Sequence, residues 1–255
     1  MSDNLKLVFL GAPRTGTKSM WIALSKHSEI ANSIVKEPWN RYSLDETIYM
    51  SKNINFYKKK FNIKHISKVL LDATPCAYNY HYNYVKNIKM PIKIIYPIRN
   101  PFDRLYSTVK QNIVSYFFHW IDKREHDFIK SKTELDYDGL LKFLIYSVDS
   151  VNIDWAYKIT KNVFMPRFDD IIVDMKQMFD FLNVIPIEKK LDRHNSMNEL
   201  WEENIFDKMR HDVEYFWNKN IKTISKIIID DLYKIKDYVY VEDYIIEAEN
   251  ILSDV

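Results

Sequence analysis

The chain has 255 residues, a formal net charge of +2 at pH 7 and 47% hydrophobic residues. This composition predicts a globular protein with an ample core, and the nearly balanced charge gives no reason to expect a nucleic-acid partner. Cys76 is the single cysteine, so no internal disulfide can form, which favours a reducing, cytoplasmic compartment. We expect no membrane span, because no apolar run reaches the ~18 residues that one needs.

Apolar runs alternate with helical patterns along the first two thirds of the chain. Four such runs predict buried strands, at residues 5–12, 68–75, 92–99 and 161–171. A helical pattern follows each run, at residues 17–27, 77–87, 102–120 and 171–184. This alternation predicts an α/β fold of the P-loop-like kind, with three layers (α/β/α) around a central parallel sheet.

The last part of the sequence has a different, mainly helical pattern. From about residue 198 onward, polar and apolar residues alternate with helical spacing. We expect a main domain over residues 1–220 and a helical C-terminal extension over 221–255 that packs on the same domain. The apolar spacing of the extension is also compatible with a contact in a homodimer.

Glycine is scarce, and its placement is informative. The chain has three glycines, Gly11, Gly16 and Gly139, whereas average usage would give roughly 18. Two of the three lie in one short segment between the first predicted strand and its helix. Glycine is therefore expected there because the backbone needs positive φ or a close approach to another group.

This first loop, "GAPRTGTKSM", has the features of an anion site. Backbone N–H groups in the first turn of a helix, together with the helix dipole, attract phosphate and sulfate groups. The loop adds two cationic side chains and several hydroxyls. The candidate ligands for an anion are Arg14, Thr15, Gly16, Thr17, Lys18 and Ser19.

The same loop departs from the nucleoside-triphosphate loop G-x-x-x-x-G-K-[ST]. Gly11 and Gly16 have the required separation, but Thr17 stands where the lysine should be. The Lys18–Ser19 pair comes one residue late. Asp72, which follows an apolar run, keeps open a metal-binding acid and hence a nucleotide kinase or NTPase.

A second candidate anion element follows the strand predicted at residues 92–99. Arg99 ends this strand, Asn100 and Pro101 begin a helix, and Ser107 lies about two helical turns further on. A guanidinium and a hydroxyl placed in this way could hold one phosphate group. Both candidate elements follow strands, and open α/β sheets bind ligands at the carboxyl ends of their strands.

Together, these two segments resemble the sulfotransferases that use 3′-phosphoadenosine 5′-phosphosulfate (PAPS). "PRTGTKSM" is similar to the 5′-phosphosulfate loop of the family, and "RNPFDRLYS" is similar to its 3′-phosphate element. The segments at 34–42, 70–78 and 164–184 are similar to stretches of the glycan, heparan-sulfate-type enzymes and of the wider superfamily. The resemblance covers roughly residues 5–220.

The resemblance implies roles for particular residues. The loop residues from Arg14 to Ser19 would hold the 5′-phosphosulfate, and Arg99 and Ser107 would hold the 3′-phosphate. Glu37 would act as the catalytic base, and Arg14 would also stabilise charge that develops during sulfuryl transfer. Lys36 would keep Glu37 ionised or contact an acidic acceptor. A glycan hydroxyl is the expected acceptor, and no metal is required.

The sequence departs from the family pattern at two positions. It also leaves open other candidates for the catalytic base and for the function. Arg14 replaces the usual lysine of the loop, and Ala73 replaces a lysine of the family. His81 and His119 are alternative bases. Besides the kinase or NTPase, a non-catalytic nucleotide-binding protein is the other alternative function.

Overall fold

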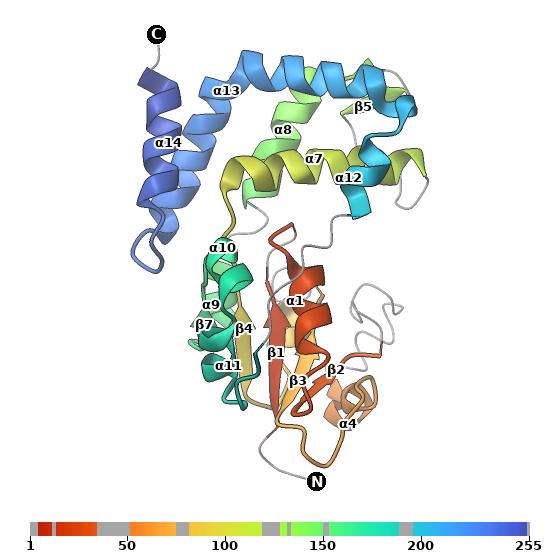
Figure 1. The fold of residues 1–255 in the computed structure, drawn as a ribbon, viewed down its shortest axis with the longest axis vertical. Coiled ribbons are helices and arrows are strands. Elements are labelled where there is room, and N and C mark those ends of the chain that lie inside the picture. Colours follow the sequence, from red (N-terminus) through yellow and green to blue (C-terminus); the bar gives the residue numbers. More distant parts are fainter. Residues whose placement is uncertain are drawn as a thin grey trace. The chain divides into compact units, whose positions relative to one another are not determined.

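The computed structural model describes residues 5–11, 14–34, 52–74, 82–118, 128–131, 134–149, 153–188 and 196–253. The chain divides into two compact units, each built from two separate segments. The first unit comprises Met1–Arg99 and Val151–His194, and the second comprises Asn100–Ser150 and Asn195–Val255 (Figure 1).

The first unit is built around a parallel sheet of five strands in the order β2-β3-β1-β4-β7. The strands are β1 (Lys6–Leu10), β2 (Ile30–Asn32), β3 (Val69–Asp72), β4 (Ile92–Ile95) and β7 (Val163–Phe164). Every neighbouring pair is parallel. The central strand β1 lies between β3 and β4, so the segments that follow β1 and β4 begin at the same edge of the sheet.

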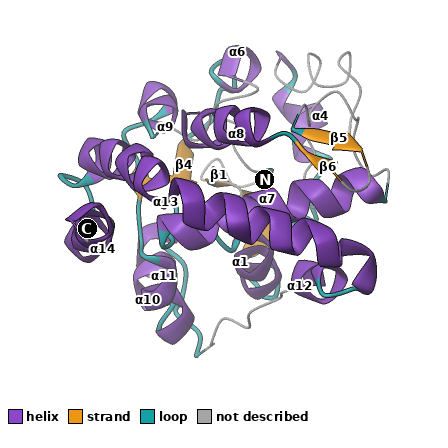
Figure 2. Ribbon diagram, turned by 90° about the horizontal axis from the view of Figure 1, so that it is seen from above, coloured by secondary structure: helices purple, strands orange, loops and turns teal. Residues whose placement is uncertain are grey.

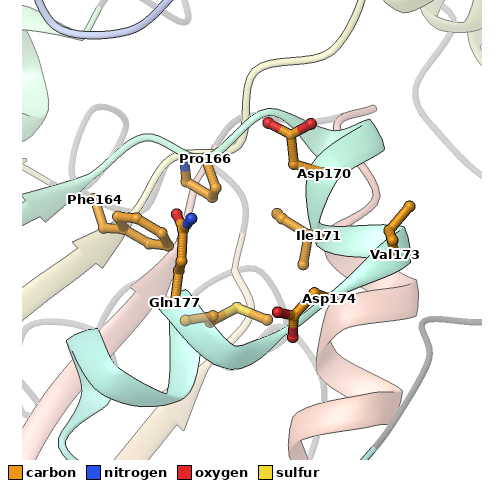
Figure 3. A pocket seen from close by; sticks show the side chains of 8 residues that line it. Phe164, Pro166, Asp170, Ile171, Val173, Asp174 and Gln177 are labelled. Carbon is orange, nitrogen blue, oxygen red and sulfur yellow. The ribbon is translucent and has the colours of Figure 1, made fainter.

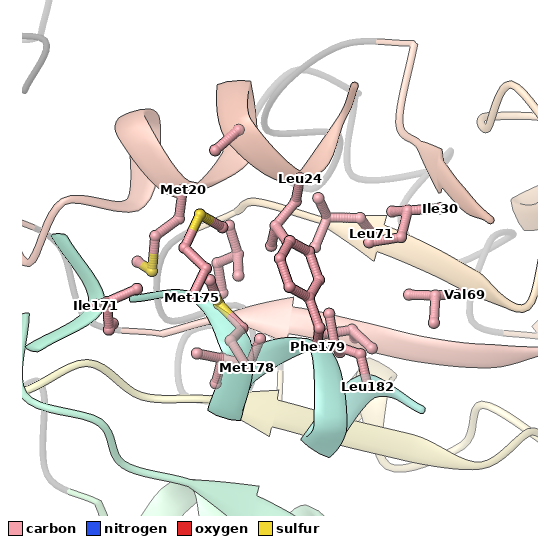
Figure 4. Packing of buried hydrophobic residues seen from close by; sticks show 14 of the residues in the cluster. Met20, Leu24, Ile30, Val69, Leu71, Ile171, Met175, Met178, Phe179 and Leu182 are labelled. Atoms are coloured by element: carbon pink, nitrogen blue, oxygen red, sulfur yellow. The ribbon is translucent and has the colours of Figure 1, made fainter. Parts of the chain in front are cut away.

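Helices surround this sheet. Those of the first unit are α1 (Thr17–Leu24), α4 (Ile54–Lys58), α6 (Tyr82–Val85), α9 (Asp154–Ile159), α10 (Phe168–Val173) and α11 (Lys176–Leu182). Val8 and Leu10 share a hydrophobic cluster with α1, α10 and α11 (Figure 4). Leu7 and Phe9 point to the opposite face, since side chains alternate along a strand, and they too are fully buried. Both faces of the sheet are therefore covered, and the predicted α/β fold with a central parallel sheet is confirmed.

The predicted element boundaries are wrong in the segment that contains β7, α10 and α11. The strand expected at 161–171 is a strand only over Val163–Phe164, and α10 already begins at Phe168. The helix expected at 171–184 is two helices, separated at Asp174. Asp174 has extended backbone, and its Oδ1 accepts a hydrogen bond from the Lys176 N–H at 2.8 Å. A bond from an aspartate side chain to the backbone N–H two residues further on competes with helical hydrogen bonding and interrupts the helical pattern.

The second unit is mainly helical, with one short antiparallel strand pair (Figure 2). Its elements are α7 (Pro101–Phe117), β5 (Ile129–Ser131), β6 (Glu134–Leu135), α8 (Tyr137–Asp149), α12 (Ser196–Trp201), η2 (Asn204–Phe206), α13 (Asp207–Ile235) and α14 (Glu242–Ser253). The helical pattern expected from about residue 198 is confirmed. Helix α13 continues without a break through residue 220, where the sequence suggested a domain boundary. No helix within the described ranges is both long and apolar enough to cross a membrane.

Two polar contacts join α7 to the C-terminal helices. Arg104 on α7 is buried and pairs with Asp231 on α13 at 3.7 Å. Asn100 caps α7, because its Oδ1 accepts hydrogen bonds from the N–H groups of Phe102 and Asp103. The amide nitrogen of Asn100 donates to Glu247 on α14 at 2.9 Å. The C-terminal extension is thus bonded to the first turn of α7.

Glu29 ties three parts of the first unit together and gives the fold a dependence on pH. Its carboxylate pairs with Lys68 at 2.5 Å and accepts a hydrogen bond from the Ile185 N–H at 2.8 Å. The bond from Lys68 and then the bond from Ile185 hold the pKa of Glu29 below its ordinary value of 4.5. Both bonds need the ionised carboxylate.

We therefore expect Glu29→Gln to lower the free energy of unfolding at pH 7, by about 1 kcal/mol. A lowered carboxyl pKa gives stability that is fully present above pH 4.5 and is lost as the pH falls through the lowered pKa. The difference between wild type and variant should shrink below pH 4.5. Urea unfolding from pH 7 down to pH 3 measures it. A difference that stays constant over this range would contradict the assignment.

Candidate anion-binding site

The loop between β1 and α1 has the backbone geometry that the glycines predicted. Gly11 lies against β4, where its N–H donates to the Ile95 carbonyl at 2.6 Å. A Cβ atom at Gly11 would lie 2.8 Å from the Ile95 oxygen and 2.9 Å from Tyr96 Cα, so no side chain fits. Gly16 is the N-cap of α1 and has φ of 84°, in the left-handed region. Gly11 therefore permits close approach to a strand, and Gly16 permits the turn into the helix.

Phe168, the first residue of α10, packs directly over this loop. A Cβ atom at Gly16 would lie 1.9 Å from Cε2 of Phe168. The N–H of Phe168 donates to the Ile98 carbonyl at 2.7 Å, which holds the start of α10 beside the end of β4. Loop, β4 and α10 are thus packed as one structure at the carboxyl edge of the sheet.

Two of the predicted ligands, Arg14 and Arg99, come together at this edge. The Nη1 atom of Arg99 donates to the backbone carbonyl of Arg14 at 3.3 Å. Burial, and then the positive charge of Arg99, lower the pKa of Arg14 to about 10. Arg14 also has φ of 67°, which is uncommon for a residue other than glycine. Arg14 and Arg99 therefore bring two positive charges to this edge of the sheet, and an anion would relieve their repulsion.

The other predicted residues of the loop divide by exposure. Thr15, Thr17 and Ser19 are buried, whereas Lys18 is exposed. No side chain at the N-cap position bonds to the first turn of α1, because that position is Gly16. The backbone of this turn, rather than a capping side chain, is thus at the start of the helix, which is the geometry of an anion site.

The remaining predicted site residues fall outside the described part of the first unit. Ser107 is a buried residue of α7 in the second unit. Glu37 and Lys36, the predicted base and its neighbour, lie outside the described residues, as do His81 and His119. Their roles remain predictions from the sequence.

Asp72, the acid that kept a metal-dependent nucleotide enzyme open, has a different role. Its Oδ2 accepts a hydrogen bond from the Tyr57 hydroxyl at 2.5 Å, and its Oδ1 accepts one from the Thr74 N–H at 2.8 Å. The side chain is fully buried. Both carboxylate oxygens thus join β3 to α4 and to the following segment, which is a structural use of the acid.

A separate pocket lies against α10 and α11 in the first unit (Figure 3). Its volume is about 270 Å³, and it is lined by Phe164, Pro166, Asp170, Ile171, Val173, Asp174, Gln177 and Met178. None of the predicted anion ligands is among these described residues. The pocket is therefore not part of the candidate anion site.

The parallel sheet, the glycine loop between β1 and α1, and the converging arginines make this edge of the sheet a candidate site for a phosphate or sulfate group. Neither a family model nor a curated protein matches the sequence. Among solved structures, a sulfotransferase from Alicyclobacillus acidocaldarius is 15% identical, with a TM-score of 0.56 over 96% of this chain and 99% of that chain. Mouse sulfotransferase SULT7A1 complexed with PAP is 16% identical, with a TM-score of 0.48 over 98% of this chain and 90% of that chain. The chain has the sulfotransferase fold, as the similarity to the bacterial enzyme shows.

Proposed function

We propose that the protein is a sulfotransferase that moves a sulfuryl group from PAPS to a hydroxyl or amine of an acceptor. The observation that carries this proposal is the pair Arg14 and Arg99, held together at the carboxyl edge of the sheet by the bond from Arg99 to the Arg14 carbonyl. A ligand with two separate anionic groups suits two guanidiniums and a helix N-terminus at one edge. The sulfotransferase fold supports the same ligand.

The loop and its neighbours would bind and orient the donor. Arg14, Lys18 and the backbone of the first turn of α1 would hold the 5′-phosphosulfate, with hydroxyls of Thr15, Thr17 and Ser19 beside them. Arg99 would hold the 3′-phosphate together with Ser107. PAPS supplies the activated sulfuryl group when it is bound. Sulfuryl transfer, like phosphoryl transfer, depends on in-line positioning and on charge stabilisation.

Three side chains would carry out proton transfer and charge stabilisation. Glu37 would accept the proton of the acceptor, and Lys36 would keep that carboxylate ionised. Arg14 would stabilise negative charge at the donor, and its position near Arg99 places a strong positive potential there. This scheme uses no metal ion.

For the acceptor we propose a glycan hydroxyl. Support comes from the sequence, where residues 34–42 and 70–78 are similar to glycan sulfotransferases of the heparan-sulfate type. The single cysteine is consistent with action in a reducing, cytoplasmic compartment.

The test is transfer of ³⁵S from labelled PAPS to a panel of acceptors in EDTA: a desulfated glycosaminoglycan, a tyrosine peptide and a small phenol. Glu37→Gln is expected to lower kcat by about 10²- to 10⁴-fold, with the affinity for 3′-phosphoadenosine 5′-phosphate (PAP) unchanged. The glutamine keeps the size of the side chain and removes the base. Transfer to the glycosaminoglycan alone would support the acceptor class.

Two other outcomes would replace the proposal. Mg²⁺-dependent phosphoryl transfer from ATP, without PAP binding, would establish the kinase or NTPase alternative. The structural use of Asp72 by Tyr57 and Thr74 is the observation that weighs against it. PAP binding without transfer to any acceptor, unaltered by Glu37→Gln, would establish a non-catalytic nucleotide-binding protein.

A further inference from the structure

A second pocket lies entirely within the second unit, between α7 and α13. Its volume is about 230 Å³. Residues from one face of each helix line it: Phe102, Asp103 and Tyr106 from α7, and Glu214, Trp217 and Asn218 from α13. The spacing of these residues, at i, i+1 and i+4 on α7 and at i, i+3 and i+4 on α13, places each set on one side of its helix. None of these residues belongs to the proposed donor site.

Aromatic rings form one side of this pocket. The rings of Tyr106 and Trp217 meet edge to face, with centroids 5.3 Å apart and an angle of 85° between their planes. Such faces carry negative quadrupole charge and attract cations. The Lys110 ammonium already lies 5.2 Å from the centre of the Tyr106 ring, so this ring does attract a cation. Tyr106 and Trp217 are both half-buried, which strengthens such attraction relative to a fully exposed ring.

Carboxylates of exposed residues also line the pocket. Asp103 and Glu214 line the pocket, and Glu214 makes no ion pair with any residue in the described part of the chain. Arg210, one turn away on α13, is engaged with Asp207 and with the carbonyls of Trp201 and Glu203. It therefore does not neutralise Glu214 by a direct contact.

The electrostatics of Tyr106 agree with a negative potential in the pocket. Burial raises the pKa of the Tyr106 phenol, the carboxylates of Glu214 and Glu202 raise it further, and the positive charge of Arg210 lowers it by less. The phenol thus stays neutral at physiological pH, so it keeps an uncharged ring and a hydroxyl at the pocket. The fixed negative charge comes from the carboxylates.

We propose that this pocket binds an alkylammonium group, with Trp217 and Tyr106 against its carbon atoms and Glu214 and Asp103 opposite its charge. Aromatic rings next to carboxylates are the chemistry that recognises organic cations. A neutral sugar could stack on the same rings and bond to the same oxygens, but it would bring no positive charge to Glu214. The volume suits one small group rather than a whole drug-sized ligand.

The test uses the full-length protein labelled with 5-fluorotryptophan and observed by ¹⁹F NMR. The chain has six tryptophans, and the resonance that disappears in Trp217→Phe identifies Trp217. Tetramethylammonium chloride and butylammonium chloride are titrated as probes, with sodium chloride at equal ionic strength and methyl glucoside as comparisons. We expect the Trp217 resonance to shift saturably with both ammonium ions, with a Kd on the order of 1 mM.

Matched variants separate a specific site from a general effect of charge. Glu214→Gln keeps the shape of the side chain and should weaken ammonium binding about fivefold. Asp230→Asn removes an exposed carboxylate of the same helix about 24 Å away and should leave binding unchanged. Binding of PAP should be the same in Glu214→Gln as in wild type, so failure of this proposal and failure of the proposed function can be told apart.

Three results would overturn the proposal. The first is a saturable shift with methyl glucoside and none with either ammonium ion, which would make the pocket a sugar site. The second is equal weakening by Glu214→Gln and Asp230→Asn, which would reduce the effect to overall charge. The third is a Trp217 resonance that responds to ammonium ions no more than to sodium.

Discussion

Replacing Arg99 with alanine is expected to weaken the binding of PAP about 100-fold. A guanidinium–phosphate contact is a charge-assisted hydrogen bond and is often bidentate, so its loss removes a large share of the affinity. The same substitution also removes the bond to the Arg14 carbonyl, which holds the strained loop residue in place. Calorimetric titration with PAP, with and without Mg²⁺, measures the change.

Two variants test whether the effect belongs to the guanidinium. Arg99→Lys keeps the charge and loses the planar fork, so we expect an intermediate loss of about tenfold. Lys64→Ala removes an exposed cation of the same unit and should leave the affinity unchanged. If Lys64→Ala weakened PAP binding as much as Arg99→Ala, the affinity would come from overall charge and the site would be misassigned. Tighter binding of ATP with Mg²⁺ than of PAP would also contradict the assignment.

Gly16→Ala is expected to destabilise the protein by about 3 kcal/mol or more. Two costs add at this position, because alanine would have to adopt φ of 84° and its Cβ would meet the ring of Phe168 at 1.9 Å. For a chain of this size such a loss lowers the thermal midpoint by about 10 °C. Thermal unfolding followed by circular dichroism measures it.

A double-mutant cycle with Phe168→Ala separates the two costs. Removing the ring takes away the overlap and leaves the backbone strain, so Gly16→Ala should cost only about 1 kcal/mol in the Phe168→Ala background. Phe168→Ala alone should destabilise, since Phe168 belongs to the core cluster. Equal effects of Gly16→Ala in both backgrounds would show that the ring does not constrain the loop.

The strand–loop–helix segment around Gly11 and Gly16 could be predicted because its signals are local. A short apolar run specifies β1, and glycine marks the positions where the backbone cannot carry a side chain. The parallel sheet followed from the alternation of strands and helices. The nearness of Arg14 to Arg99 also followed, because both come after strands of one parallel sheet.

The unpredicted features depend on contacts between distant parts of the chain. Nothing near Asp72 in the sequence indicates that Tyr57 would bind one of its oxygens, so its structural use could not be seen. The pocket between α7 and α13 needs the pairing of two helices whose lining residues are about 110 positions apart in the sequence. Asp174 is different, since an aspartate whose side chain bonds to the N–H two residues further on is a local turn signal, which helical periodicity does not contain.

The division of the first unit into two segments has a consequence for the order of events during synthesis. Strands β1 to β4 leave the ribosome early, but Phe168, Met178, Phe179 and Leu182, which cover one face of the sheet, come only after the 51 residues Asn100–Ser150 of the other unit. Until then, α1 alone packs on that face, and the apolar side chains that α10 and α11 later cover are exposed to water. The anion loop is equally incomplete, because Phe168 closes over Gly16. The first unit can therefore complete its fold only after the inserted segment Asn100–Ser150 has been translated. During that interval the nascent chain needs protection from aggregation.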